Sequence, residues 1–158
     1  MLEPAIAHKE ELLTLFSKEI YTEGYMLYSG WPFDFTLPTI DDSAYHYRWA
    51  VVDEGKVIGY FAYEYWSVSD CMTNFGLYSF DRGNPKVGLD VFRKMDELVE
   101  KHHRVSWIVL SNNPVVRHYD KFCERHNGRK VVLHDYTKSL NGEFVDQYIY
   151  EIVKGKRL

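Results

Sequence analysis

The stretch Phe75–Gly88 constrains the fold more than any other part of this chain. Residues Phe75 to Phe80 are aromatic and apolar enough to form a buried strand. Residues Asp81 to Gly88 include two glycines, an asparagine and a proline, which predicts a loop. Apolar side chains then recur at helical spacing, at Leu89, Phe92, Met95, Leu98 and Val99. The pattern is therefore a strand, a glycine-containing loop and a helix.

A loop of this kind directs free backbone N–H groups toward the start of the new helix. The helix dipole makes the same place attractive to anions. The alternative is an ordinary strand-to-helix turn, and this stretch alone favours neither. Val105–Leu110 follows the helix as another buried strand, and a helical crossover places it parallel to the strand before the loop.

Composition indicates one globular domain spanning residues 1–158. The chain is 46% hydrophobic and 27% charged, which is too apolar for a disordered segment. A net charge of −4 argues against nucleic acid as the main partner. No apolar run reaches membrane-spanning length, and the first residues lack the pattern of a signal peptide. Cys71 and Cys123 are far apart and are expected to be reduced core thiols of a cytoplasmic protein.

The remaining elements follow from periodicity and turn residues. The predicted helices are Lys9–Ile20, about Gly88 to His103, and one that starts after Ser111–Pro114 and ends at Asn127–Gly128. The predicted strands are Arg48–Val52, Lys56–Trp66, Met72–Phe80, Val105–Leu110, Arg129–Asp135 and Phe144–Val153. A three-strand meander followed by one crossover predicts an α+β fold, with a mixed, mostly antiparallel sheet.

Residues Tyr25 to Pro38 are expected to be irregular, yet they are rich in aromatic side chains, which include Tyr28 and Trp31. Such a segment does not lie open in water. Either it packs on the sheet as a lid over the core or part of it forms the wall of a ligand pocket, and the two are compatible. Tyr28 and Trp31 are therefore candidate substrate-binding residues.

Glu64 is a carboxylate in an aromatic strand. It is either paired, exposed at the strand end, or perturbed by its apolar surroundings. Asp70 and Asn74 lie near the start of the next strand and are weaker candidates than Glu64 for a general base. The seven His residues form no set with metal-ligand spacing, so no metal is expected.

Three pieces of the chain resemble the GNAT superfamily of acyl-CoA-dependent N-acetyltransferases. The hairpin Val51–Tyr60 is similar to the second and third strands of that family. Leu77–Phe80 with Arg82–Gly88 is similar to its fourth strand and pyrophosphate loop. Asn112, followed seven residues later by Tyr119 and then by Asp120-Lys121-Phe122, is similar to its Asn…Tyr-Glu-Lys-Leu helix. The resemblance spans roughly Trp49 to Val153, and Lys9–Phe35 fits the N-terminal helical region of the family.

The resemblance implies an enzyme that transfers an acetyl group from acetyl-CoA directly to an amine, without a metal. Tyr119 would be the general acid, and Glu64 the candidate base. Asn74 joins Tyr28 and Trp31 as an acceptor-site residue. The implied cofactor-binding residues are Ser79, Phe80, Asp81, Arg82, Gly83, Asn84, Lys86, Val87, Gly88 and Asn112. For Tyr119 the alternative is packing, because it shares an apolar helix face with Val115, Val116 and Phe122.

The loop departs from the family pattern. If Gly88 takes the last position, Lys86 stands where glycine is usual and Gly83 where arginine or glutamine is usual. Pro85 has no N–H to donate. These departures sustain an alternative function, a non-catalytic binding or assembly module with the GNAT fold that uses its aromatic N-terminal segment as an interface. The acceptor, a small molecule or a peptide amine, and a homodimer both stay open.

Overall fold

The computed structural model describes residues 1–29 and 35–157, so Trp31 lies outside the described residues. The strands are β1 (Leu2–Pro4), β2 (His46–Asp53), β3 (Lys56–Trp66), β4 (Cys71–Ser79), β5 (Arg104–Leu110), β6 (Arg129–Lys138) and β7 (Phe144–Val153). The α-helices are α1 (Lys9–Glu19), α2 (Glu23–Ser29), α3 (Pro85–Lys101) and α4 (Val116–Arg125), with short 3₁₀ turns at Ala5–His8 and Ser67–Ser69.

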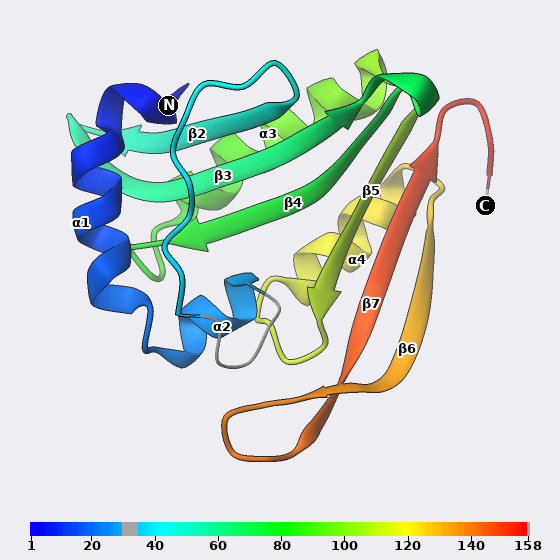
Figure 1. The fold of residues 1–158 in the computed structure, drawn as a ribbon. Helices are drawn as coiled ribbons and strands as arrows, with labels where there is room; N and C mark the ends of the chain where they lie inside the picture. The colour runs from blue at the N-terminus through cyan, green and yellow to red at the C-terminus, as the bar shows by residue number, and fades with distance from the viewer. Residues whose placement is uncertain (30–34, 158) are drawn as a thin grey trace.

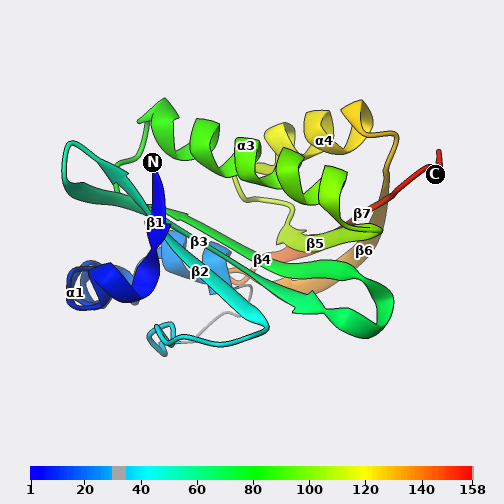
Figure 2. The ribbon, with the colours of Figure 1, turned by 90° about the horizontal axis from the view of Figure 1, so that it is seen from above.

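The strands form one sheet in the order β1-β2-β3-β4-β5-β7-β6 (Figure 1). Only β4 and β5 pair in parallel among the described strands. Helices α3 and α4 cover one face of the sheet, and α1 and α2 lie on the other (Figure 2). The predicted α+β class and mixed sheet are confirmed.

Each helical layer has its own apolar core. On the α3/α4 side the core is built around Trp107 and Tyr150, whose rings stack at 5.0 Å. On the α1/α2 side it is built around Phe16, which is fully buried. The Phe16 ring contacts the rings of Tyr25, Tyr28, Tyr60, Tyr78 and Phe80, at centroid distances of 4.9 to 5.9 Å. These contacts fix α2 against the sheet.

Most predicted elements are present, and β3 and β7 have the predicted bounds. Strand β1 was not predicted, and β2 and β6 are longer than predicted. Two further differences have a clear physical cause. The segment predicted to be irregular from Tyr25 onward contains α2, a helix too short for reliable periodicity that is held by tertiary packing on Phe16. Helix α3 begins at Pro85, earlier than predicted, because the Asn84 side chain accepts the N–H of Lys86 at 3.0 Å and caps the helix.

Two residue pairs join the described strands β4 and β5, Cys71 with Arg104 and Met72 with Val105. Asp70, the residue before β4, stabilises this junction by three contacts. Its Oδ1 atom lies 2.8 Å from Nδ1 of His102, and its Oδ2 atom accepts the N–H of His103 at 2.9 Å. The Asp70 carbonyl accepts the N–H of Arg104 at 3.1 Å. Asp70 has a left-handed backbone, with φ of 43°, which lets one residue serve all three contacts.

Replacing Phe16 with alanine is expected to lower the free energy of unfolding by about 3–5 kcal/mol, since a buried ring with five aromatic neighbours is lost. Phe144→Ala is the matched control, because Phe144 is 58% exposed. It is expected to change stability by no more than about 0.5 kcal/mol. Urea unfolding measures both values, and equal losses would contradict the described core.

Acid is expected to weaken the contact that Asp70 makes with α3 and β5. The hydrogen bond with His102, and after it the N–H of His103, lower the pKa of the Asp70 carboxyl. A carboxyl whose pKa is lower in the folded chain stabilises the fold above its unfolded pKa of about 3.9, and this stabilisation is lost as pH falls through the folded pKa. Asp70→Asn should therefore be less stable than the parent protein at neutral pH. The gap in urea midpoint should narrow below about pH 4, whereas a pH-independent gap would refute the role of the charge.

Candidate functional site

Strands β4 and β5 part immediately after their two paired residues. From Thr73 to Ser79 the β4 edge that faces β5 has no strand partner. An unpaired strand edge presents backbone N–H and C=O groups that can pair with an extended ligand. The central strand β4 therefore has an unpaired edge to which an extended ligand could bind.

Three cavities surround this opening, and Tyr28 lines all of them. The loop cavity, of about 600 Å³, lies between the end of β4, the start of α3 and the turn before α4. The cleft cavity, of about 330 Å³, lies between β4 and β5. The Glu64 cavity, of about 250 Å³, lies over β2, β3 and β4.

The loop cavity contains most of the residues predicted to bind a cofactor. These are Ser79, Arg82, Gly83, Asn84, Val87, Gly88 and Asn112. Phe80, Asp81 and Lys86 do not line it. Phe80 packs on Phe16, the Asp81 carboxylate accepts a hydrogen bond from the Asn84 amide at 2.9 Å, and Lys86 Nζ pairs with Asp53 at 2.5 Å.

The backbone of the loop is only partly available to a ligand. The N–H of Asn84 is donated to the Asp81 carbonyl at 3.1 Å, and that of Lys86 to the Asn84 side chain. Both N–H groups therefore already have a partner within the loop, whereas cofactor binding by Asn84 and Lys86 stays a prediction. Pro85 occupies the first helical position, where no N–H is needed, so its presence does not weaken the helix start. Val87 lies in the first turn, where N–H groups have no partner within the helix.

Sequence reasoning missed two walls of the loop cavity. Glu23, Gly24 and Leu27 of α2 form one, and Asn113, Pro114, Val115 and His118 form the other. A Cβ atom at Gly24 would meet Nη2 of Arg82, so a larger residue there would push this guanidinium away from α2. The Glu19 carboxylate lies 3.7 Å from the same nitrogen. No pattern along the sequence connects α2 with the loop, because their contact exists only in three dimensions.

A β-bulge connects the cleft cavity with the Glu64 cavity. Gly76 pairs with Ala62 and Thr73 with Glu64, which leaves Asn74 and Phe75 opposite a single residue of β3. Asn74 has a φ of 53°, and its amide donates to Oε2 of Glu64 at 2.8 Å. The bulge thus brings together two residues that were predicted separately from the sequence.

Tyr28 completes this group at the junction of the three cavities. A Cβ atom at Gly76 would lie 2.7 Å from the Tyr28 ring, so the glycine lets the ring lie against β4. Burial, and after it the neighbouring Tyr60 and Tyr25, raise the pKa of the Tyr28 hydroxyl well above its ordinary value. Tyr28 therefore stays uncharged at neutral pH.

Tyr119 lies behind the wall of the cleft cavity rather than in it. Its ring packs at 5.5 Å from Trp107, which stacks on the cavity-lining Phe75. Among the described residues, three buried nitrogens have no hydrogen-bond partner, and they belong to Trp49, Trp107 and His102. The Tyr119 hydroxyl is not one of these enclosed, unpaired atoms. Burial raises the pKa of Tyr119. The ring thus packs, and its hydroxyl makes no hydrogen bond to any described residue that would compete with a ligand.

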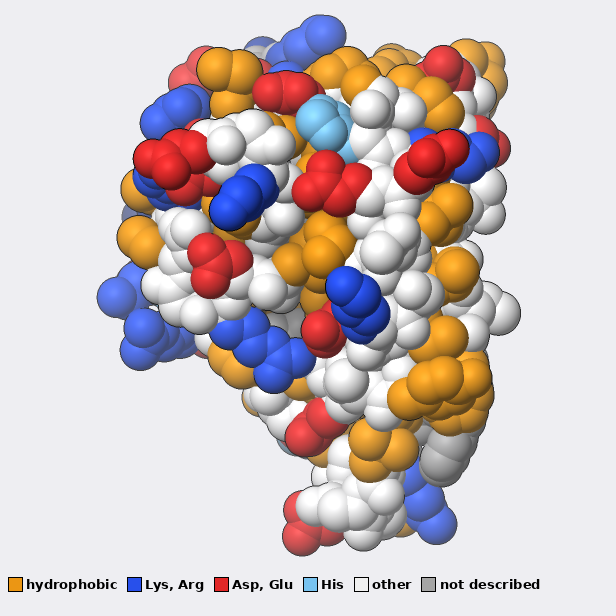
Figure 3. All heavy atoms as spheres, turned by 90° about the vertical axis from the view of Figure 1, so that its left-hand side faces the viewer, with side chains coloured by type: hydrophobic (Ala, Val, Ile, Leu, Met, Phe, Trp, Pro, Cys, Tyr) orange, Lys and Arg blue, Asp and Glu red, His pale blue; other side chains and the backbone are white. Residues whose placement is uncertain are grey.

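We also searched the described residues for a metal site, a membrane-spanning helix and a charged surface patch. Within residues 1–29 and 35–157, no three His, Cys, Asp or Glu side chains are grouped so that they could hold a metal ion. None of the described helices is both long and apolar enough to cross a membrane. On the face shown in Figure 3, acidic and basic side chains are interspersed rather than gathered by charge.

No protein-family model matches this sequence, and no curated protein matches it at the sequence level. Solved structures do match its fold. An N-acetyltransferase from Staphylococcus aureus is 14% identical, with a TM-score of 0.68 and 97% of each chain covered. A ribosomal-protein-alanine N-acetyltransferase from Brucella melitensis is 13% identical, with a TM-score of 0.64, 97% of this chain and 99% of that one covered.

A probable acetyltransferase of the GNAT family from Chromobacterium violaceum is 14% identical, with a TM-score of 0.65. The alignment covers 98% of this chain and 86% of that one. These likenesses extend over nearly the whole chain. The chain therefore has the fold of the GNAT acetyltransferases.

Proposed function

We propose that this protein is an N-acetyltransferase that transfers an acetyl group from acetyl-CoA directly to an amine. The observation that carries the proposal is the parting of β4 from β5 beside the start of α3. It combines an unpaired strand edge with a helix N-terminus, and these two features suit a pantetheine arm and a pyrophosphate. The proposal treats residues 1–158 as one cytoplasmic domain.

The residues present fit acetyl-CoA, which supplies an acyl group activated as a thioester. The free edge of β4 up to Ser79 would pair with the pantetheine arm. The first turn of α3 at Val87 and the guanidinium of Arg82, which is 69% exposed, would meet the pyrophosphate. Asn112, at the turn before α4, closes the loop cavity from the other side.

Glu64 and Tyr119 would manage the protons of the transfer. Glu64, directly or through a water, accepts the proton that the amine loses as its nitrogen bonds to the acetyl carbon. As the bond from that carbon to sulfur breaks, Tyr119, whose ring lies behind the wall of the cleft cavity, would donate to the departing sulfur through a water. The raised pKa of Tyr119 keeps the phenol protonated until then. Asn74 orients the carboxylate through its hydrogen bond to Oε2.

Known neighbours of this fold act on different amines. They include a spermidine/spermine N-acetyltransferase from Vibrio cholerae, 17% identical over 70% of this chain, with a TM-score of 0.55. The Brucella protein is named for ribosomal-protein alanine. These names support acetyl transfer to an amine. Because they differ in the acceptor, the acceptor of this chain has to be inferred from its own residues.

Acetyl-CoA titration by calorimetry tests the proposal, and we expect saturable binding. Tyr119→Phe should leave the dissociation constant nearly unchanged and lower turnover by about 10²-fold or more, since only the proton donor is removed. Its stability should match that of the parent, because the hydroxyl makes no hydrogen bond to a described residue.

Two results would count against this reading. Absence of binding at millimolar acetyl-CoA would favour the non-catalytic module that the altered loop sequence suggests. Unchanged turnover of Tyr119→Phe would leave Tyr119 a packing residue and would remove it from the acid role.

A further inference from the structure

The Glu64 cavity is a small, partly open space on the α1/α2 face of the sheet. Tyr28 covers one side, and Pro38 and Thr39 belong to the segment that crosses over β2, β3 and β4 (Figure 1). Its volume of about 250 Å³ lies below the usual range for drug-sized ligands. A compact group is what this cavity has room for.

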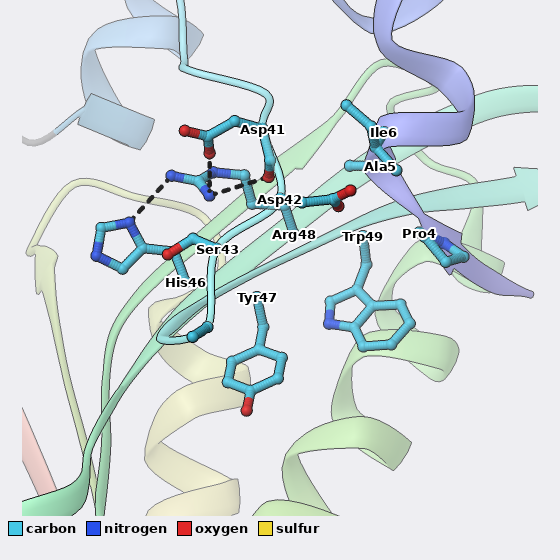
Figure 4. A pocket seen from close by; sticks show the side chains of 11 residues that line it. Pro4, Ala5, Ile6, Asp41, Asp42, Ser43, His46, Tyr47, Arg48 and Trp49 are labelled. Atoms are coloured by element: carbon cyan, nitrogen blue, oxygen red, sulfur yellow. Dashed lines mark hydrogen bonds and ion pairs between the residues drawn. The ribbon is translucent and has the colours of Figure 1, made fainter.

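The charge of Arg48 in this cavity is already matched. Figure 4, which shows the neighbouring pocket on the other side of Arg48, places its guanidinium between the carboxylate of Asp41 and the imidazole of His46. Nη1 lies 2.7 Å from Oδ1 of Asp41, and Nη2 lies 3.2 Å from Nδ1 of His46. Because arginine only donates, Nδ1 of His46 accepts, and the neutral ring carries its proton on Nε2.

The charge of Glu64 is not matched in this way. Among the described residues, its neighbours are the neutral amide of Asn74 and the imidazole of His46, whose Nε2 lies 3.9 Å from Oε1. No lysine or arginine of the described chain pairs with it. One carboxylate is therefore left to bind a cation.

The rest of the described lining is uncharged. Burial raises the pKa of Tyr60 to about 12, so this side chain stays neutral at physiological pH. Pro38, Ala62 and the ring of Tyr28 complete an apolar and aromatic wall, whereas the rings of Tyr47 and Tyr63 stack on each other in the core on the α3/α4 side. A second ammonium or a carboxylate on the ligand would find no free partner of opposite charge among these residues, and such a group is costly to bury.

We infer that the acceptor is a small primary amine with one positive charge and an uncharged, largely apolar body. The ammonium binds at Glu64 and loses one proton to solvent before the transfer, so that the carboxylate is free to take the second proton as the nitrogen bonds to the acetyl carbon. The body of the amine packs against Tyr28 and Tyr60. This inference rests on the proposed acetyl transfer and selects among its acceptors. Diamines, free amino acids and peptide N-termini are the competing classes.

Matched pairs of amines test it. Release of free thiol from acetyl-CoA is followed with 2-phenylethylamine against phenylalanine, with butylamine against 1,4-diaminobutane, and with an alanine-starting tripeptide amide. We expect kcat/KM for each monoamine to exceed that of its partner, and that of the peptide, by about tenfold or more. Equal or better use of phenylalanine, the diamine or the peptide overturns the inference.

Two variants test the charge argument itself. Glu64→Gln should raise KM for 2-phenylethylamine about tenfold or more, with the acetyl-CoA dissociation constant unchanged. Asp41→Asn should release the charge of Arg48 and shift preference toward phenylalanine, and an unchanged ratio would overturn the assignment. If acetyl-CoA binds and no monoamine is used, the inference fails alone, whereas absence of acetyl-CoA binding defeats the proposed function.

Discussion

The structure depends on a limit to the hydrogen bonding between β4 and β5. Two residue pairs join these strands, and Asp70 secures them by contacts to His102, His103 and Arg104. Beyond this point the strands separate, so backbone groups that a sheet normally satisfies are left along β4. Unpaired backbone groups are costly to bury without partners, and a ligand with its own donors and acceptors can supply them.

Aromatic residues determine which side chains line the opening between β4 and β5. Phe16 holds α2 against the sheet, and α2 carries Tyr28 to the junction of the three cavities. Gly76 provides the space for the Tyr28 ring, and the bulge beside it turns Asn74 toward Glu64. The binding edge, the carboxylate and the aromatic wall are thus parts of one packed arrangement.

Local patterns along the sequence predicted much of the fold and part of the candidate site. The buried strands and the hairpin at Asp53–Gly55 were predictable because alternation and turn residues are local signals. The roles of Phe80 and Lys86 were not. Both belong to the predicted loop stretch, but Phe80 is drawn into the core by Phe16, and Lys86 is drawn away by Asp53 on the β2–β3 hairpin. Such competition between partners is decided by tertiary contacts.

The sequence by itself determined the order of the elements from β2 to β7, the crossover between β4 and β5, and Glu64 and Asn74 as separate candidates. Periodicity, turn residues and the resemblance to GNAT enzymes can all be recognised from the order of residues along the chain. Only the tertiary structure decided that Arg48 is neutralised by Asp41 while Glu64 is not, and that Tyr119 stands one ring behind the cavity. Charge pairing and burial depend on which side chains meet in space, and residues as distant in sequence as Tyr28 and Gly76 meet only after the sheet has formed.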